Sequence, residues 1–186
     1  MPRTSLPKRS AAGPPSWAVV TAHRTKHIER VVRLLSEWGD AMGVSAREHQ
    51  RWLRAAWMHD ALKDAPRDVV RDLAAGFDGP PALWHGPAAA RRAELDGERD
   101  QGVLDAVRYH SVGFAGWDRV GRMLYLADFL ETGRRHRDPM RAAQADRVPD
   151  DPEGVLREVA RDRIAHGIQK GWPLLPETVA FWNALT

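Results

Sequence analysis

Six side chains of the sequence have the types and positions that a metal site requires. They are histidines and aspartates on or beside helical faces that are otherwise apolar: His27, His59, Asp60, His85, His110 and Asp128. An unpaired buried carboxylate is costly, and a divalent metal ion is one of the few partners that satisfies a carboxylate together with several imidazoles. The other histidines have no matching inward acid and are interpreted as ordinary core or surface residues: His23, His49, His136 and His166. One such histidine alone would be read in the same way, but six positions together indicate a metal site.

Helices must position these residues, because apolar side chains recur with helical spacing around them. From Trp17 to Gly39 this spacing predicts a first helix that carries His27 on its apolar face. Residues 45–48 have the pattern of a capping box, a serine followed three residues later by a glutamate, and predict the start of a second helix. His59 and Asp60 lie near its end. Their adjacency allows one helix end to offer two ligands to one ion, or allows Asp60 to bridge two ions.

Further helices are predicted downstream, and we find no alternating strand pattern. Their expected ranges are 66–76, 87–95, 98–110, 117–134, 150–171 and from 176 onward. The helix within 150–171 is expected to turn four apolar residues inward: Val155, Leu156, Val159 and Ile168. Residues 135–151 are charged and contain prolines, so we interpret them as a mobile or irregular connection that could serve as a lid. The predicted fold class is all-α, a single helical bundle.

The composition is that of a globular protein with a substantial core, since 43% of the 186 residues are apolar and 28% are charged. Residues 1–15 are basic and rich in proline and predict a flexible N-terminal arm, and residues 16–186 predict one compact domain. The 28 lysines and arginines exceed the 25 aspartates and glutamates only slightly, which fits anionic small substrates without calling for nucleic acid. A homodimer is compatible with these features.

Cysteine is absent, so disulfides and thiol chemistry are excluded and any metal site must use histidine and carboxylate ligands. No apolar run approaches the ~20 residues of a membrane span, and the N-terminus lacks the apolar segment of a secretory signal. We therefore expect a cytoplasmic protein without a membrane partner.

The order of the ligands carries a family resemblance. His27, the pair His59-Asp60 and then Asp128 resemble the H...HD...D pattern of the HD superfamily of phosphohydrolases. Five segments in order resemble one branch of it, the YqeK-like symmetrical diadenosine-tetraphosphate hydrolases: Arg24 to His27, His59 to Asp64, His85-Gly86, Tyr109 to Gly113 and Leu126 to Arg134. The resemblance covers roughly Arg24 to Leu185. The chain departs from that branch at Val112, where a threonine is usual, and at Thr132, where a proline is usual.

The resemblance implies an all-α HD-domain fold and a metal held by His27, His59, Asp60 and Asp128. His85 and His110 would hold a second metal or contact phosphate oxygens directly, and both readings stay open. One or two divalent transition-metal ions are expected, with iron first and manganese, zinc or nickel as alternatives. A water whose pKa is lowered by the metal would attack phosphorus.

Further residues are assigned to the substrate and to proton transfer. Lys63 follows His59 by four residues and on a continuing helix would reach a phosphate, or else is a solvated lysine. Asp64 is expected to orient the attacking water or protonate the leaving group, or else forms an ordinary surface pair. By resemblance, Arg24 and Ser111 are expected to bind substrate. Arg134 is expected to clamp phosphate, or else is a favourable charge at a helix C-terminus.

The expected function is hydrolysis of diadenosine tetraphosphate to two ADP, with catalytic roles for Asp60, Lys63 and Asp64. The first alternative is another HD-type nucleotide phosphohydrolase, either a nucleoside monophosphate phosphatase or a cyclic-nucleotide phosphodiesterase. The second alternative, from a different class, is a non-catalytic nucleotide-binding module. That alternative would predict a missing ligand or a lost Lys63, and the sequence retains them all.

Overall fold

The structure is a computed structural model that describes residues 13–131, 133 and 138–186. Among these described residues the structure contains helices and no strands, which confirms the predicted all-α class. In chain order they are α1 (Ala22–Ala41), α2 (Ala46–Met58), α3 (Arg67–Leu73), the short 3₁₀ helix η1 (Pro81–Leu83), α4 (His85–Leu95), α5 (Gln101–Tyr109), α6 (Arg119–Leu130), α7 (Pro139–Arg147), α8 (Pro152–Gln169) and α9 (Pro176–Leu185). The predicted N-terminal arm lies outside the described residues up to residue 12.

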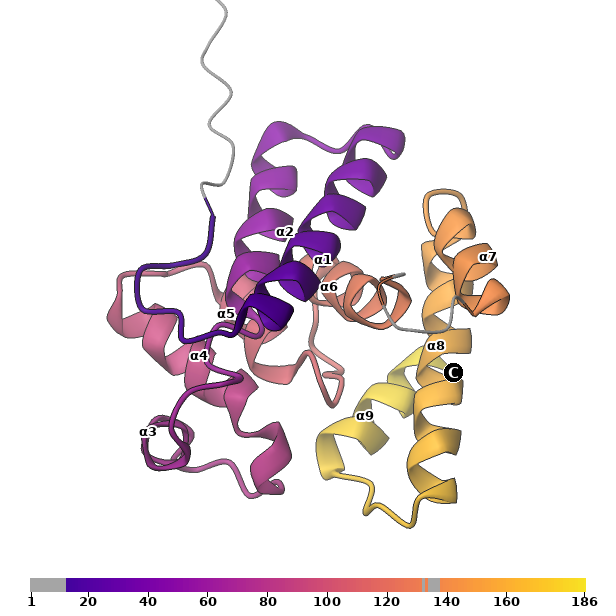
Figure 1. Cartoon of the computed structure of the whole chain (residues 1–186). Helices are drawn as coiled ribbons and strands as arrows, with labels where there is room; N and C mark the ends of the chain where they lie inside the picture. Colours follow the sequence, from indigo (N-terminus) through magenta and orange to yellow (C-terminus); the bar gives the residue numbers. More distant parts are fainter. Residues whose placement is uncertain (1–12, 132, 134–137) are drawn as a thin grey trace, which may run out of the picture.

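Helix α6 is the centre of the arrangement. It contacts α1, α2 and α5 on one side and α7 and α8 on the other, so the pair α1 and α2 and the pair α7 and α8 lie on opposite sides of it (Figure 1). Eight of its twelve residues are buried, among them Met123, Leu124 and Leu126. A helix that is apolar around most of its circumference is stable only inside a core. Asp128 is carried on this core helix, near its C-terminal end.

Short polar side chains fix where the helices begin. The Ser45 hydroxyl accepts a hydrogen bond from the Glu48 amide at 3.2 Å, which confirms the predicted start of α2. In a full capping box the Glu48 carboxylate would accept from the Ser45 amide. Here it accepts from Trp52 and Arg51 instead. Each cap of this kind stabilises a helix by about 1 kcal/mol. The first helix begins at Ala22 rather than Trp17, since Thr21 is its N-cap and its hydroxyl accepts from the Arg24 amide.

The prediction of an irregular, lid-like connection over 135–151 is wrong for its described part, because Pro139–Arg147 form helix α7. The Asp138 carboxylate accepts from the Met140 amide at 3.0 Å, and proline is well suited to the first helical position that follows. Gln144 and Ala145 are buried, and the Trp38 indole donates to the Ala145 carbonyl at 3.1 Å. The segment is therefore held against the core.

Helix α8 begins as predicted after Asp151, but its inward face differs at the C-terminal end. Val155, Leu156 and Val159 are fully buried, whereas Ile168 is 59% exposed and was wrongly predicted to face inward. The buried side continues to Gly167. None of the described helices is long and apolar enough to cross a membrane.

Candidate metal centre

His59 and Asp60 continue the chain directly beyond the last residue of α2, in the middle of the fold. His59 has helical dihedral angles and is 0% exposed, and Asp60 is 4% exposed. His27 reaches them from α1 and Asp128 from α6, while His85 opens α4 and His110 follows α5. The six side chains predicted from the sequence therefore meet at one place, although they come from five helices or helix ends.

The Asp60 carboxylate stands between two pairs of histidines. Its Oδ2 atom lies 3.6 Å from His27 Nε2 and 3.8 Å from His59 Nε2. Its Oδ1 atom lies 3.3 Å from His85 Nε2 and 3.7 Å from His110 Nε2. Asp128 adds Oδ1 to the first pair, at 3.2 Å from His27 Nε2 and 4.0 Å from His59 Nε2. The pair His27 and His59 and the pair His85 and His110 thus share the Asp60 carboxylate.

The other ring nitrogen of each histidine faces an acceptor. Nδ1 lies 2.7 Å from the Ala56 carbonyl in His59, 2.8 Å from the Val107 carbonyl in His110 and 3.1 Å from the Ala82 carbonyl in His85. In each case the carbonyl belongs to the residue three positions earlier. A carbonyl oxygen only accepts, so in His59 and His110 these contacts assign the proton to Nδ1 and leave a lone pair on Nε2, whereas His85 Nδ1 also lies 3.1 Å from Lys63 Nζ. His27 Nδ1 lies 3.1 Å from the Glu131 carboxylate, which accepts a hydrogen bond from it.

These donors fit metal ions. Ligands about 2.0–2.2 Å from one ion are separated from each other by roughly 2.8–3.6 Å. The Nε2 atoms lie 3.3 Å apart in the pair His27 and His59, and 3.1 Å apart in the pair His85 and His110. An ion between the two Nε2 atoms of a pair would accept a lone pair from each ring, with the His27 ring giving up its proton on binding. Asp60 with either pair brings its donor atoms within 4.8 Å of one another.

Burial and neighbouring charges set the protonation state of the buried groups. Burial lowers the pKa of His59 to about 4 and that of His85 to about 4, so both rings are neutral at pH 7. Burial acts to raise the pKa of Asp60, but the histidines around it hold that pKa well below its usual range, so the carboxylate is ionised. Burial also lowers the pKa of His27, yet hydrogen bonds to the carboxylates Asp128 and Glu131 outweigh it and raise the value to about 9.

Glu131 is a functional candidate that the sequence analysis did not single out. It is 4% exposed, and besides His27 its carboxylate accepts from Arg30 Nε and from the Gly133 amide. Burial acts to raise its pKa, but the hydrogen bonds from His27 and Arg30 lower that pKa to about 2. Such a carboxylate orients a ligand and fixes its tautomer. The signal in the sequence was its position three residues after Asp128, near the end of the same helix.

Basic and hydroxyl groups surround the donors and line a cavity of about 660 Å³. Arg24 donates to Asp60 Oδ2 at 2.7 Å, and Lys63 Nζ lies 3.1 Å from His85 Nδ1. Burial lowers the pKa of Lys63. The Ser111 hydroxyl lies 3.1 Å from His110 Nε2. His23 also lines the cavity, although the sequence analysis gave it no role.

One expected site residue, Asp64, is not brought to the donors. Asp64 is exposed, and its Oδ2 atom accepts from the backbone amide and the hydroxyl of Thr21, each at 2.8 Å. Asp64 therefore contacts the N-cap residue of α1 and helps to position the start of that helix, rather than lying beside the histidines. Arg134 lies outside the described residues.

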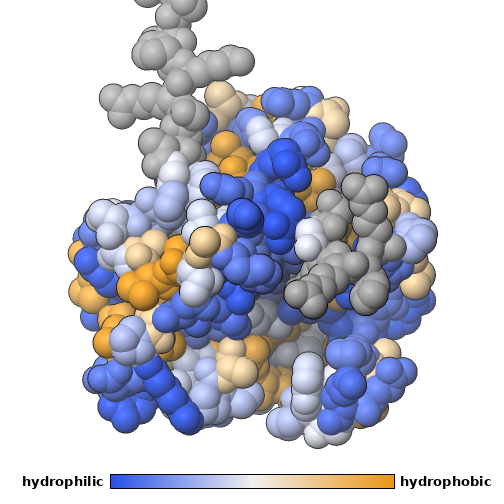
Figure 2. All heavy atoms as spheres, in the orientation of Figure 1, coloured by the Kyte–Doolittle hydropathy of each residue, from blue (hydrophilic) through white to orange (hydrophobic). Residues whose placement is uncertain are grey.

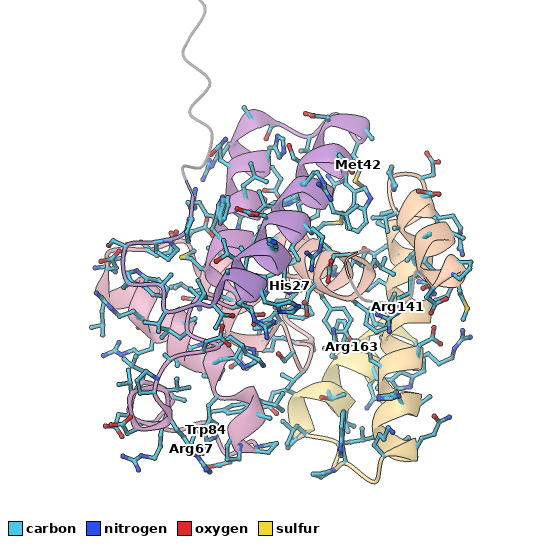
Figure 3. The ribbon with its side chains drawn as sticks, viewed as in Figure 1. His27, Met42, Arg67, Trp84, Arg141 and Arg163 are labelled. Atoms are coloured by element: carbon cyan, nitrogen blue, oxygen red, sulfur yellow. The ribbon has the colours of Figure 1, made fainter. Side chains whose placement is uncertain are left out.

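Arg163 of α8 was missed by the sequence analysis, yet it lines the cavity (Figure 3). Its guanidinium donates to the Ser111 carbonyl at 2.9 Å and lies 3.8 Å from Asp128 Oδ2. It also stacks over the Tyr125 ring, with 4.5 Å between the guanidinium carbon and the ring centroid. An arginine that follows Leu156 and Val159 on the buried face of a helix was the available signal.

Comparison with known proteins finds relatives in sequence and in fold. Two relatives, one from Bacillus subtilis (strain 168) and one from Halalkalibacterium halodurans, are each named symmetrical bis(5'-nucleosyl)-tetraphosphatase. Each is 26% identical over 176 residues, which cover 89% of this chain and 91% and 90% of the relatives respectively. A crystal structure from Clostridium acetobutylicum, described as a predicted HD superfamily hydrolase involved in NAD metabolism, has a similar fold. Its TM-score is 0.76 at 22% identity, covering 89% of this chain and 90% of that one. The HD domain model matches residues 24–153, and the chain therefore belongs to the HD domain family.

Proposed function

We propose that the protein is a metal-dependent phosphohydrolase that cleaves diadenosine tetraphosphate at its middle into two ADP. The observation that carries the proposal is the Asp60 carboxylate held between two pairs of imidazoles, with Arg24, Lys63 and Arg163 lining the same cavity. The names of the two bacterial relatives support the choice of substrate.

The donors divide between two ion positions. His27, His59, Asp60 and Asp128 would hold the first ion, and Asp60 with His85 and His110 would hold the second. A divalent ion bound there would polarise a phosphoryl oxygen and lower the pKa of a water molecule. The absence of cysteine leaves nitrogen and oxygen donors, which suit iron first, and manganese, zinc or nickel as alternatives.

The basic side chains would hold the polyphosphate. Arg24, Lys63 and Arg163 reach the cavity from α1, from the loop after α2 and from α8, so they approach a bound chain of phosphates from different sides. Charge-assisted hydrogen bonds from such groups are about twice as strong as neutral ones. Lys63 lies next to His85 and would contact a phosphate oxygen close to the reacting phosphorus.

Proton transfer to the leaving group makes a smaller demand here than in ester hydrolysis. The leaving group would be a nucleoside diphosphate, which departs as a weak base because its terminal phosphate has a second pKa of about 6. A strong general acid is therefore unnecessary. This agrees with the position of Asp64, which hydrogen-bonds to Thr21 and is assigned no catalytic role in the proposal.

The test is chromatography of products after incubation of the purified protein with diadenosine tetraphosphate and each of several divalent metals. Two ADP support the proposal, whereas AMP with ATP would show attack away from the middle and refute the substrate position. Brisk hydrolysis of a nucleoside monophosphate or cyclic nucleotide, without cleavage of the dinucleotide, would transfer the assignment to another HD-type phosphohydrolase. Silence across the panel with retained nucleotide binding would indicate a non-catalytic module.

A further inference from the structure

A second cavity, of about 560 Å³, adjoins the metal centre. Residues of α6, α7 and α8 line it together with the segment that leads into α9. Among the residues that the structure describes, three line both this cavity and the one at the metal centre: Ser111, Asp128 and Arg163. A ligand that reaches from one cavity into the other must therefore pass these three residues.

The walls of this second cavity expose large apolar side chains. Met140 is 63% exposed, Trp172 is 61% exposed and Leu174 is 41% exposed, and all three line it. Exposed apolar side chains that gather at one hollow mark a ligand or partner surface more often than single ones do. Figure 2 shows hydrophobic surface low in the middle of one face, between the parts that hold α3 and α9. The volume lies within the roughly 300–1,000 Å³ that small-molecule sites occupy.

Gly167 keeps part of this volume open. It is buried in the last turns of α8 and lines the cavity, and a Cβ atom built there meets no atom within 4 Å. A glycine inside a helix destabilises it relative to alanine, so it needs a reason. Neither a positive φ angle nor a close neighbour requires glycine at this position. Open space for a ligand is the reason that remains.

Arg163 stands one helical turn before Gly167, at the boundary of the two cavities. Its guanidinium is fixed by the Ser111 carbonyl at 2.9 Å and by the rings of Tyr125 and Phe129, whose centroids lie 4.5 and 5.6 Å away. An arginine held in this way is suited to bind phosphate. The fixed Arg163 guanidinium therefore lies between the apolar walls of the second cavity and the metal donors.

We propose that this second cavity binds the nucleoside of the substrate and that Arg163 binds the phosphate next to it. A nucleoside diphosphate unit has the matching order of parts: a flat base that stacks on apolar and aromatic walls, a ribose, and phosphates that extend to the metal centre. This inference rests on the proposed function, since it names the part of the chain that binds one half of the substrate.

The test compares two hydrolysis-resistant probes that differ only in the nucleoside, α,β-methylene-ADP and methylenediphosphonate. Their affinities for the metal-loaded protein are measured by calorimetry in wild type, in Gly167→Leu and in Ala165→Leu. Ala165 is exposed on the same helix and does not line the cavity, so it gives a matched control for added bulk. Leucine is a good helix former, and melting temperatures at or above that of wild type verify that both variants are folded.

In wild type and in Ala165→Leu, α,β-methylene-ADP should bind at least about tenfold more tightly than methylenediphosphonate, because one stacked base contributes about this much. Gly167→Leu should reduce this ratio to near one while the affinity for methylenediphosphonate is retained. An unchanged ratio in Gly167→Leu, or no preference for the nucleoside in wild type, would overturn the inference. If diadenosine tetraphosphate is not cleaved but the ratios behave as expected, the proposed reaction fails and the nucleoside site stands.

Discussion

Replacing Glu131 by glutamine tests whether the hydrogen bond to His27 matters for the metal centre. The carboxylate accepts from three donors, namely His27 Nδ1, Arg30 Nε and the Gly133 amide. An amide of the same shape has one accepting atom, so its NH₂ group must face at least one of these donors. The variant therefore keeps the volume of the side chain and removes its ability to satisfy all its partners.

The size of the effect follows from the contacts. A hydrogen bond to a charged group contributes about 1.5–3 kcal/mol when its partner is buried. Residues that orient metal ligands typically change metal affinity by about 10–100-fold when they are replaced, which is the same range of free energy. Since the pKa of Glu131 is about 2, its carboxylate is ionised at every pH used for the assay. We therefore expect Glu131→Gln to weaken metal binding by about 10–100-fold at pH 7.

The assay is a competition titration of the metal-free protein against a chelator of known affinity. Glu153→Gln is the matched control, because Glu153 pairs with Arg122 at an exposed site far along the chain from the donors. An exposed ion pair contributes about 1 kcal/mol or less, and none of that energy is coupled to the metal. Equal metal affinity in Glu131→Gln and in wild type would refute the role given to Glu131.

Four other changes test the rest of the site. Asp60→Ala should lose bound metal from both positions in elemental analysis, and full retention of metal and activity would contradict the shared carboxylate. Lys63→Ala should raise KM for diadenosine tetraphosphate by about 10–100-fold with bound metal unchanged; loss of metal with normal nucleotide binding would reverse the division of roles. The raised pKa of His27, about 9, means that this ring is protonated in the metal-free protein at pH 7. Metal binding should therefore release about one proton from it, and affinity should rise about tenfold per pH unit between pH 7 and 9; absence of proton release in a weakly buffered titration would argue against this. Asp64→Ala should lower stability by about 1 kcal/mol through loss of its bonds to Thr21 while leaving kcat within about twofold of wild type; a large fall in kcat without loss of stability would restore a catalytic role.

Helical periodicity predicted the all-α class, the capping box predicted the start of α2, and polar groups on apolar faces predicted that six side chains lie together. These predictions succeeded because they rest on local signals: a cap such as Ser45, and charged or imidazole groups on apolar faces such as His27 and Asp128. The joint position of the six donors followed from the cost of burying carboxylates, which is a physical argument that needs no knowledge of how the helices pack.

The failures concern features that only packing decides. Helix α7 has two buried residues, Gln144 and Ala145, so its sequence carries little apolar periodicity, and contacts with α6 and α8 hold it in place. Asp64 lies four residues after Asp60 but the chain turns after α2, so this spacing does not bring it to the donors. Arg163 lies on the buried face of α8, which its spacing from Leu156 and Val159 indicates, but only the packing of α8 against α6 brings it to Asp128.

The three bonds from histidine rings to carbonyls three residues earlier have a consequence for the rate of metal exchange. Each ring of His59, His85 and His110 is oriented by its own chain segment, independently of any ion. Replacement of one ion by another then requires no reorientation of these ligands. The exchange rate should depend on how fast the ion sheds its hydration water, so slowly dehydrating ions would enter slowly even where they bind tightly.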